Sequence, residues 1–348
     1  MSDTLNEIQS TPRPICAVCG TKGEPLYKGL RDRIFGAPGS WDLKVCSNRD
    51  CGLIWPDPMP LAEEIGKAYA SYYTHVPDTS GSSSPLKLFY LGIKRRWLND
   101  RYGYLAGASE TSSGGQAKKT HWFFPMLRQP AFRDVRFLPF VEKGKLLDVG
   151  CGSGQWLVEM KNLGWIADGV DFDPMAVKAA CAMGLDVRVG SVEDQNFPTA
   201  SYDAITLSHV IEHVPDPIGT IKECARLLKP GGRLVLFTPN ASSLCHRYFK
   251  QDWRGLEPPR HLHIFSLNAM RKMFANLDFQ HVSVQPETGT SVTFESYLLR
   301  RYRPANVNLT IRRWRNHAFW RLFSIFQYGL IGLVPSIGEC QVVVAIKR

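Results

Sequence analysis

The feature that most constrains the fold is a regular alternation of short apolar runs with helix-like segments between about residues 145 and 287. The runs are β-rich, and they read KLLDVG, ADGVDF, DVRVG, YDAITL, RLVLFTP and HVSVQ. Such alternation is typical of βαβ units, which build a parallel sheet with helices on both faces. A last run, CQVVVAIK, ends the chain as a further strand. We therefore predict an α/β fold with a doubly wound, seven-stranded, mostly parallel sheet.

The first run leads into a glycine-rich turn. Residues 146–154 read LLDVGCGSG, and a helical pattern starts directly after them. Glycine has no Cβ, so it lets a backbone approach a ligand closely. The next run, ADGVDF, contains a strand that ends at Asp171, about twenty residues after the turn. A carboxylate at this point can accept hydrogen bonds from both hydroxyls of a ribose. The turn and the carboxylate together predict a nucleotide-type cofactor site.

These ordered motifs resemble the class I S-adenosylmethionine-dependent methyltransferases, which have a Rossmann-like fold, over about residues 145–285 and the final strand. The resemblance implies S-adenosyl-L-methionine as the cofactor. It places Asp148 and Gly150 beside the methionine moiety, Asp171 at the ribose and residues 190–194 along the adenine, although many relatives have Asp where this chain has Ser191. The implied cofactor-binding residues are Asp148, Gly150, Gly152, Gly154, Asp171, Phe172, Val192, Glu193 and Ser208.

Histidines and a glutamate gather after the fourth and fifth runs. His209, Glu212 and His213 have the i, i+3, i+4 spacing that would place them on one face of a helix, and His261 and His263 follow the next strand. Loops at the carboxyl ends of strands face the ligand crevice of a doubly wound sheet. We expect His213 and His261 to be the general-base candidates, with Glu212 as their catalytic neighbour, because imidazole titrates near working pH. The alternative is that these residues only cap the turn and shape the acceptor pocket.

A metal is a second interpretation of the same cluster. Residues 210–214, VIEHV, look like the ubiquinone-pathway O-methyltransferases and the small-RNA 3′-terminal 2′-O-methyltransferases, the latter of which bind a divalent metal. This resemblance implies a second divalent metal, held by His209, Glu212, His213 and either His263 or His261. This chain has His209 where the metal-binding family has Glu. We favour the metal-free base.

Four cysteines near the N-terminus form two pairs. Cys16 and Cys19 are spaced CxxC, while Cys46 and Cys51 are spaced Cx4C, and a glycine follows each pair. Two such pairs suit a ribbon that offers four thiolates to a tetrahedral zinc ion. With all four positions filled by cysteine, the zinc would be structural. The pattern therefore predicts a structural zinc site in the first sixty residues.

These motifs divide the chain into four predicted blocks. The first is a zinc-ribbon-like cysteine block (12–60), and the second is a helical linker or cap region (61–140). The α/β core follows (141–290 plus 339–348), interrupted by a basic, aromatic, helical insertion (291–338).

Charge and hydropathy suggest where the chain acts. The formal net charge is +10, and seven arginines with no Asp or Glu lie between positions 300 and 321. Arginines beside an aromatic-rich helix suit a lid over the acceptor pocket or a contact of residues 300–334 with an anionic membrane. They would equally suit a phosphate-bearing substrate or an RNA backbone. The RNA interpretation rests on charge alone, so we do not expect a nucleic acid partner. The polar N-terminus does not match a signal peptide. We expect a cytoplasmic protein, at the inner face of the membrane if the insertion contacts lipid.

The cysteine block joined to this core also resembles a bacterial family from surface polysaccharide and sugar-metabolite pathways, which matches the segments CGLIWPDP, DWRGLEPPRHLHIFS and GECQVVVAIKR. The resemblance implies O-methylation of a sugar or glycan hydroxyl, including lipid- or nucleotide-linked acceptors. The alternatives are a quinol-like small-molecule hydroxyl, an RNA 2′-hydroxyl, or a cofactor-binding subunit without turnover.

Overall fold

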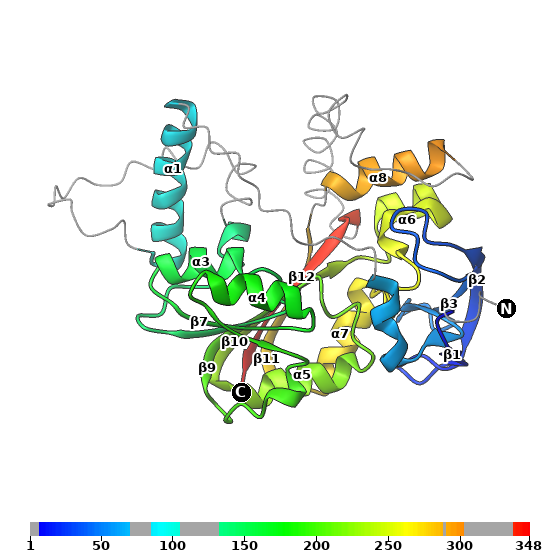
Figure 1. The fold of residues 1–348 in the computed structure, drawn as a ribbon, viewed down its shortest axis with the longest axis horizontal. Helices are drawn as coiled ribbons and strands as arrows, with labels where there is room; N and C mark the ends of the chain where they lie inside the picture. Colours follow the sequence, from blue (N-terminus) through cyan, green and yellow to red (C-terminus); the bar gives the residue numbers. More distant parts are fainter. Residues whose placement is uncertain (1–6, 70–84, 105–131, 288–289, 303–336) are drawn as a thin grey trace, which may run out of the picture. The chain divides into compact units, whose positions relative to one another are not determined.

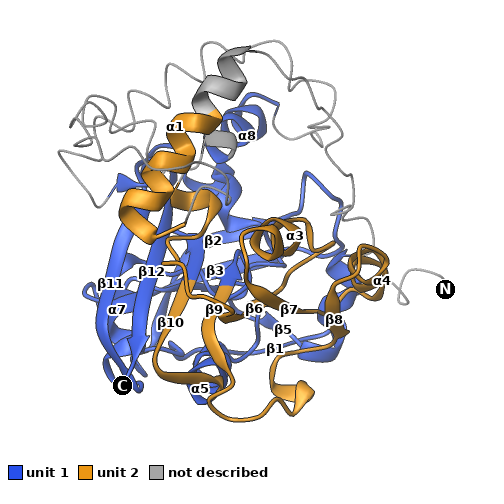
Figure 2. Ribbon diagram, turned by 90° about the vertical axis from the view of Figure 1, so that its left-hand side faces the viewer, with its two compact units in different colours: residues 1–73, 207–226, 236–348 blue, residues 74–206, 227–235 orange. Residues whose placement is uncertain are grey.

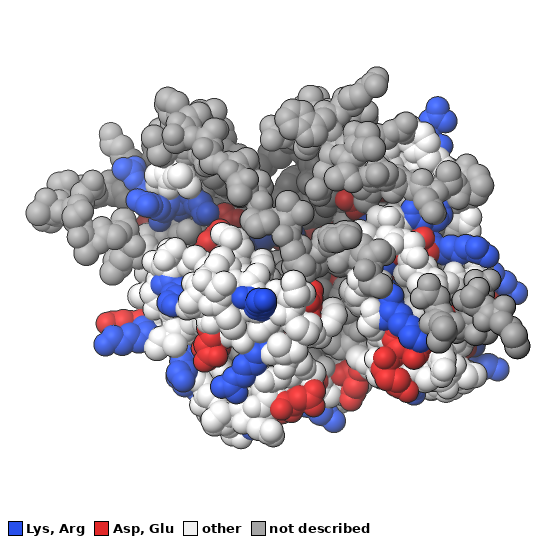
Figure 3. Space-filling view, viewed as in Figure 1, with Lys and Arg blue, Asp and Glu red and all other residues white. Residues whose placement is uncertain are grey.

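The computed structural model describes residues 7–69, 85–104, 132–287, 290–302 and 337–348 (Figure 1). Contacts divide the chain into two compact units, coloured separately in Figure 2. Unit 1 comprises residues 1–73, 207–226 and 236–348, and unit 2 comprises residues 74–206 and 227–235. Basic and acidic side chains are interspersed over the described part of the face in Figure 3.

The central sheet has the predicted seven strands within the described part of the chain, in the order β11-β12-β10-β9-β6-β7-β8. β6, β7 and β8 pair in parallel, and β11 and β12 pair antiparallel. The mostly parallel α/β sheet predicted from the sequence is therefore confirmed. Its strands are β6 (Lys145–Val149), β7 (Ile166–Asp171), β8 (Asp186–Val189), β9 (Tyr202–Ser208), β10 (Leu228–Pro239), β11 (Phe279–Glu287) and β12 (Cys340–Lys347).

Unit 2 carries the glycine-rich turn. Helix α3 (Gln155–Asn162) follows β6, α4 (Pro174–Ala182) follows β7, and the short 3-10 helix η4 (Glu193–Gln195) follows β8. The Asp173 side chain accepts the backbone N–H of Met175, so α4 begins with a side-chain cap and with Pro174 in its first turn. A long helix, α1 (Pro85–Tyr102), also belongs to this unit. The buried core includes Leu146, Leu147, Leu157, Met160, Val170 and Ala180.

Unit 1 begins with the cysteine block. Strands β2 (Gly23–Leu30), β3 (Trp41–Cys46) and β4 (Ile54–Pro56) form an antiparallel sheet, and β1 (Ser10–Thr11) pairs with β5 (Met59–Pro60). The 3-10 helix η2 (Ala62–Tyr69) follows. The remaining elements are α5 (Pro217–Leu227), α6 (Leu244–Phe249), η5 (Lys250–Asp252), η6 (Arg254–Leu256), α7 (Leu267–Ala275) and α8 (Thr290–Arg301).

The cysteine block shares a hydrophobic core with a distant part of the chain. Leu43 and Ile54 pack with Phe249, Trp253 and Ile264 in one buried cluster. Ile54 and Ile264 also exchange two backbone hydrogen bonds, of 3.0 and 2.8 Å. The block therefore belongs to the same compact unit as residues 236–348, and the units do not follow the boundaries of the predicted blocks.

The basic insertion lies largely outside the described residues. Helix α8 covers its start, whereas residues 303–336, which carry most of the predicted membrane-contact segment, fall in the undescribed range. Among the described residues, the helices are all too short or too polar to traverse a bilayer.

Candidate functional site

The glycine turn of unit 2 leaves open space above its backbone. Gly152 has φ +56°, and a Cβ built on it would have no heavy atom within 4 Å. Gly154, by contrast, is packed against the protein: a Cβ there would come within 2.4 Å of the Leu185 side chain and 3.0 Å of Ala180. Gly154 thus allows α3 to lie close to α4 and β8, while Gly152 leaves room for a ligand.

Asp171 holds this turn in place. Its Oδ2 accepts the backbone N–H of Gly152 at 2.7 Å, and its Oδ1 accepts that of Asp173 at 2.9 Å. Burial raises the pKa of the Asp171 carboxyl, and these two backbone hydrogen bonds oppose the rise. Each carboxylate oxygen has a second lone pair. The carboxylate is therefore oriented by the backbone and keeps acceptor capacity for hydroxyl groups.

Asp148 lies at the end of β6 in a buried network. Its Oδ1 is paired with the Arg136 guanidinium and accepts the Thr206 hydroxyl at 2.7 Å, while its Oδ2 has no hydrogen-bond partner among the described residues. The Arg136 guanidinium also stacks over the Trp156 ring, 3.7 Å from its centroid. Burial raises the pKa of Asp148, and the Arg136 charge opposes this. A buried carboxylate oxygen without a partner is an acceptor ready for a donor group.

The predicted adenine segment follows β8. Val192 is buried, whereas the Phe172 side chain is 58% exposed. The Ser191 hydroxyl donates to Asp194 at 2.7 Å, next to the exposed Glu193. Ser208 ends β9 and belongs to unit 1. Asp148, Gly150, Gly152, Gly154, Asp171, Phe172, Val192 and Glu193 all belong to unit 2.

The segment after β9 is a turn and not the helix that the spacing of its histidine and glutamate residues predicts. His209 has φ 57°, in the left-handed region, and α5 begins only at Pro217. The backbone carbonyl of Glu212 accepts the N–H groups of Leu262 (2.7 Å) and His263 (3.1 Å). These hydrogen bonds fix the turn to the segment that contains the second pair of histidines. The helical-face prediction is therefore wrong, because the backbone reverses within the spacing.

The turn nevertheless brings three of the predicted residues together. Ligand atoms of Glu212, His213 and His261 lie within 4.8 Å of one another. His209 lies beside them, with its Nδ1 3.2 Å from Glu212 Oε1. His263 is not in this group of three, and its Nε2 lies 3.4 Å from the carbonyl oxygen of Pro215. We call Glu212, His213 and His261 the His–Glu cluster.

Backbone carbonyls determine the tautomers of the two histidines in the cluster. Nδ1 of His213 lies 3.0 Å from the carbonyl oxygen of Arg260, and Nδ1 of His261 lies 2.8 Å from that of Gly255. A carbonyl oxygen can only accept, so each Nδ1 carries the hydrogen. Each Nε2 of the neutral ring then keeps its lone pair. The Tyr69 hydroxyl, 2.8 Å from Nδ1 of His213, adds a second contact on the same side of the ring.

Charge in the cluster is concentrated on the glutamate. Burial alone would raise the pKa of Glu212, but the hydrogen bond with His209 lowers it. Burial lowers the pKa of His213 and, more strongly, that of His261. Glu212 Oε2 has no hydrogen-bond partner among the described residues. The cluster thus combines an ionised carboxylate with two neutral imidazoles.

The four predicted cysteine ligands meet in unit 1. Their sulfur atoms lie within 4.8 Å of one another, with Cys16 to Cys51 at 3.7 Å and Cys19 to Cys46 at 3.4 Å. The edge of a tetrahedron of sulfurs around zinc is about 3.8 Å, given Zn–S bonds of about 2.3 Å. The hydrogen bond with Cys51 lowers the pKa of Cys16 to about 5, whereas burial raises that of Cys46 to about 12. The geometry and the donor set fit a tetrahedral metal.

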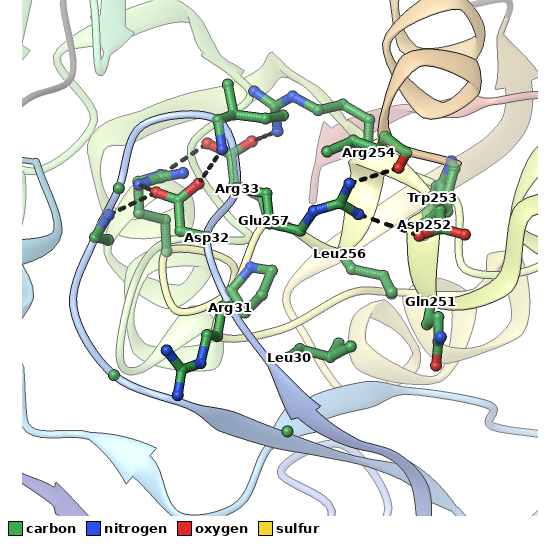
Figure 4. Close-up of a pocket in the computed structure, with 18 of the residues that line it drawn as sticks. Leu30, Arg31, Asp32, Arg33, Gln251, Asp252, Trp253, Arg254, Leu256 and Glu257 are labelled. Carbon is green, nitrogen blue, oxygen red and sulfur yellow. Dashed lines mark hydrogen bonds and ion pairs between the residues drawn. The ribbon is translucent and has the colours of Figure 1, made fainter. Parts of the chain in front are cut away.

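A cavity of about 570 Å³ lies next to the His–Glu cluster in unit 1 (Figure 4). It is lined by residues 28–39, at the end of β2 and in the loop after it, and by the turns of residues 251–260. Arg260 and Glu257 belong to its lining. The Arg260 carbonyl binds His213, and Glu257 Oε2 lies 3.6 Å from Nε2 of His261. Two residues of the cavity lining, Arg260 and Glu257, therefore contact the histidines of the cluster.

Several residues that contact Asp148 and His213 were not identified from the sequence. Arg136 and Thr206 partner Asp148, and Tyr69 and Arg260 contact His213. Arg136 and Tyr69 lie in the predicted linker block, where no periodic pattern marks them. Arg260 precedes His261 directly, so its place in the rim segment was the one available signal.

Comparison with known families supports the fold assignment. Residues 126–284 match a family model described as a methyltransferase domain. Curated relatives include the ubiquinone biosynthesis O-methyltransferase of Xanthomonas oryzae pv. oryzae (strain PXO99A), 48% identical over 103 residues, which are 28% of this chain and 43% of the relative. The enzyme of the same name from Xanthomonas axonopodis pv. citri (strain 306) is 45% identical with the same coverage. The match thus spans less than half the length of these relatives.

Solved structures give more distant similarities. A SAM-dependent methyltransferase from Archaeoglobus fulgidus is 20% identical with a TM-score of 0.43, over 64% of this chain and 94% of its own. The geranyl diphosphate C-methyltransferase from Streptomyces coelicolor A3(2) is 16% identical with a TM-score of 0.43, over 76% of this chain and all of its own. Both are too distant to bear on the substrate of this chain.

Proposed function

We propose that this chain, which contains a class I S-adenosylmethionine-dependent methyltransferase domain, O-methylates a hydroxyl group of a sugar or glycan. The observation that carries the proposal is the nucleotide-type cradle of unit 2, in which the Asp171 carboxylate is fixed to the backbone of an open glycine turn. The His–Glu cluster and the charged cavity of unit 1 supply the arguments for the acceptor.

The residues of the cradle fit S-adenosyl-L-methionine. The cofactor supplies a methyl group on a positively charged sulfur, which is electrophilic without further activation. Asp171 has acceptor capacity for the two ribose hydroxyls, and the open space at Gly152 admits a ligand close to the backbone. The partnerless Oδ2 of Asp148 can accept from the amino group of the methionine moiety, while the Arg136 guanidinium opposes the rise in the Asp148 pKa that burial causes.

His213 is the proposed general base. Its Nδ1–H is held by the carbonyl of Arg260, so the lone pair of Nε2 is available for the proton of an acceptor hydroxyl. The neutral ring is the form that can take up this proton, and burial favours it. The ionised Glu212 stabilises the imidazolium that results. His261 has the same tautomer and is the second candidate for this role.

The same donor set fits a divalent metal, which is the competing mechanism. Glu212, His213 and His261 offer one carboxylate oxygen and two imidazole nitrogens. Each Nδ1–H donates to a backbone carbonyl, as the second nitrogen of a metal-bound histidine usually does. A metal held there would lower the pKa of the acceptor hydroxyl. Two imidazoles favour a borderline metal such as Zn²⁺ over Mg²⁺, which prefers oxygen ligands.

For the cysteine cluster we propose structural zinc. Four sulfurs at these separations leave no open coordination position, so a bound zinc would have no catalytic role. Its role would be to order residues 12–60, whose contribution to the shared core includes Leu43 and Ile54.

The cavity favours a sugar over a quinol as the acceptor. Eight of its lining residues are Lys, Arg, Asp or Glu, and such walls suit a polar molecule with many hydroxyls better than an aromatic ring with an apolar substituent. The curated relatives carry the name of a ubiquinone-pathway enzyme, which favours the quinol-like hydroxyl as the second candidate.

The test is transfer of a labelled methyl group from S-adenosyl-L-methionine to a panel of nucleotide sugars, lipid-linked glycans, quinols and RNA. We expect label in a sugar ether that survives alkali. Label in the quinols alone would replace the sugar by the second candidate, and label in the RNA alone would refute both. Tight cofactor binding without transfer to any acceptor would indicate a subunit without turnover.

A further inference from the structure

The cavity of unit 1 has an unusual charge arrangement. Its lining includes the cations Lys28, Arg31, Arg33, Arg254 and Arg260 and the carboxylates Asp32, Asp252 and Glu257. Figure 4 shows the loop around Arg31, Asp32 and Arg33 on one side and the turns with Asp252, Arg254 and Glu257 on the other. The cations therefore outnumber the carboxylates by two.

Ion pairs within the wall use all three carboxylates. Asp32 pairs with Arg260 at 2.8 Å and also accepts the N–H groups of Ile34, Phe35 and Ala37. Asp252 lies 3.3 Å from the Arg33 guanidinium. Glu257 pairs with Arg260 at 2.8 Å and with Arg254. The side chains of these pairs are at most 17% exposed, so all three carboxylates have cationic partners within the wall.

Lys28 and Arg31 are the two cations that remain. Both are exposed, and among the described residues neither has a carboxylate or other hydrogen-bond partner. They are three positions apart, at the end of β2 and just beyond it. Both line the cavity and are exposed, so their charged donors can bind an anion without displacing an existing partner.

The cavity is also connected to the proposed base. Arg260, whose guanidinium lies in the cavity wall, provides the carbonyl that holds His213 Nδ1–H. Glu257 lies 3.6 Å from His261. A molecule that fills the cavity can therefore have an anionic end at Lys28 and Arg31 and a neutral, hydroxyl-bearing end toward the His–Glu cluster.

We propose that this cavity binds a phosphate or diphosphate ester, with the phosphate oxygens at Lys28 and Arg31. Two unpaired cations match the charge of a diphosphate, and guanidinium and ammonium groups are the usual donors to phosphate oxygens. The cavity volume of about 570 Å³ is in the range of small-molecule sites and accommodates a sugar beside the phosphates. The binding of the ester by this cavity does not depend on the proposed function. Its identification as the methyl acceptor rests on that function.

The experiment measures binding to the full chain by calorimetry, without S-adenosyl-L-methionine. The probes are inorganic pyrophosphate, uridine diphosphate and farnesyl diphosphate in neutral detergent micelles, which share the diphosphate and differ in what carries it. The test variant is Lys28→Ala/Arg31→Ala. The control is Lys178→Ala/Lys222→Ala, which removes the same net charge from exposed positions of α4 and α5 that do not line the cavity.

We expect at least one diphosphate to bind the wild type and the control equally, and to bind the test variant about tenfold to a hundredfold more weakly. The probe that binds most tightly identifies the group attached to the diphosphate: uridine diphosphate indicates a nucleotide, farnesyl diphosphate a lipid, and pyrophosphate neither. Equal affinity for the test variant and the wild type would overturn the proposal, as would the absence of binding by all three probes. Because methyl transfer is not measured, these outcomes are independent of whether the chain is a sugar methyltransferase.

Discussion

The backbone carbonyl of Arg260 lies 3.0 Å from Nδ1 of His213, while the guanidinium of the same residue pairs with Asp32 at 2.8 Å in the wall of the cavity. One residue therefore contacts the proposed base through its main chain and lines the cavity through its side chain. Arg260 thus contacts both His213 and the loop that contains Asp32.

His213 separates the two mechanisms. If it is a metal-free base, His213→Ala should lower turnover by about 10²- to 10⁴-fold, because the hydroxyl proton loses its acceptor, and should leave cofactor affinity unchanged. Exposed His281 provides the control, since His281→Ala should have no effect. Turnover is measured with and without a chelator, with the zinc content checked. Activity lost to the chelator and recovered with added divalent metal, while the cysteine zinc stays bound, would favour the metal.

Asp171 tests the cofactor site. Asp171→Ala should weaken S-adenosyl-L-methionine binding by about 1.5–3 kcal/mol, because charge-assisted hydrogen bonds to two hydroxyls are lost. Asp186→Ala removes an exposed carboxylate from the start of the neighbouring strand β8 and should leave binding unchanged. Calorimetry on both variants makes the comparison. Unaltered affinity in Asp171→Ala would remove this residue from the ribose role.

The cysteine cluster makes a prediction about metal content. Metal analysis of the purified protein should find one zinc ion per chain, and Cys16→Ser/Cys19→Ser should lose it, because serine is a poor zinc ligand. Cys181→Ser, at an exposed cysteine of α4, should keep it. A metal-free wild type whose first sixty residues resist proteolysis would contradict the zinc assignment.

Arg136 should contribute to stability as well as to the cofactor site. Arg136→Leu leaves Asp148, which is 1% exposed, without its cation, and breaking a buried pair in this way costs about 3–5 kcal/mol. Adding Asp148→Asn to this variant should recover part of the loss, since the buried group is then neutral. Denaturant unfolding of Arg136→Leu, Asp148→Asn and the double variant gives the coupling free energy between the two side chains. Additive effects would mean that the two side chains do not interact.

The buried His246 should make the stability of unit 1 sensitive to acid. Burial lowers its pKa below the usual value of 6.5, and Nδ1–H donates to the carbonyl of Ala241 at 2.6 Å. The neutral form is favoured in the folded chain, so the unfolded chain binds the extra proton below pH 6.5. The stability present above this pH is therefore lost as the pH falls toward the folded pKa, by about 1.4 kcal/mol per pH unit for each such group. The free energy of unfolding is measured at several pH values. Its decrease with falling pH should be shallower for His246→Gln than for the wild type or His281→Gln.

The parts of the structure that sequence could predict are those encoded locally. The strand, glycine turn and Asp171 lie within 26 residues of one another and follow a spacing set by the βαβ unit, so their contacts could be expected. The meeting of the four cysteines was predictable from the close spacing within each pair, whereas the zinc itself stays a prediction.

The rest depended on long-range packing. His209, Glu212 and His213 have helical spacing, but the positive φ of His209 and the hydrogen bonds from Leu262 and His263 to Glu212 make the segment a turn. That geometry selects His261 and not His263 as the third member of the cluster. The pairing of Arg136 with Asp148 and the cavity between loop 28–39 and turns 251–260 likewise join segments that no local pattern connects.

The core shared by the cysteine block and residues 241–264 has a consequence during protein synthesis. Leu43 and Ile54 leave the ribosome about 200 residues before Phe249 and Ile264, the side chains that bury them. Until then the nascent block can gain order from its own strands and from metal, but not from its full core. The four thiols of Cys16, Cys19, Cys46 and Cys51 are thus open to the metal ions and oxidants of their surroundings while most of the chain is still being made.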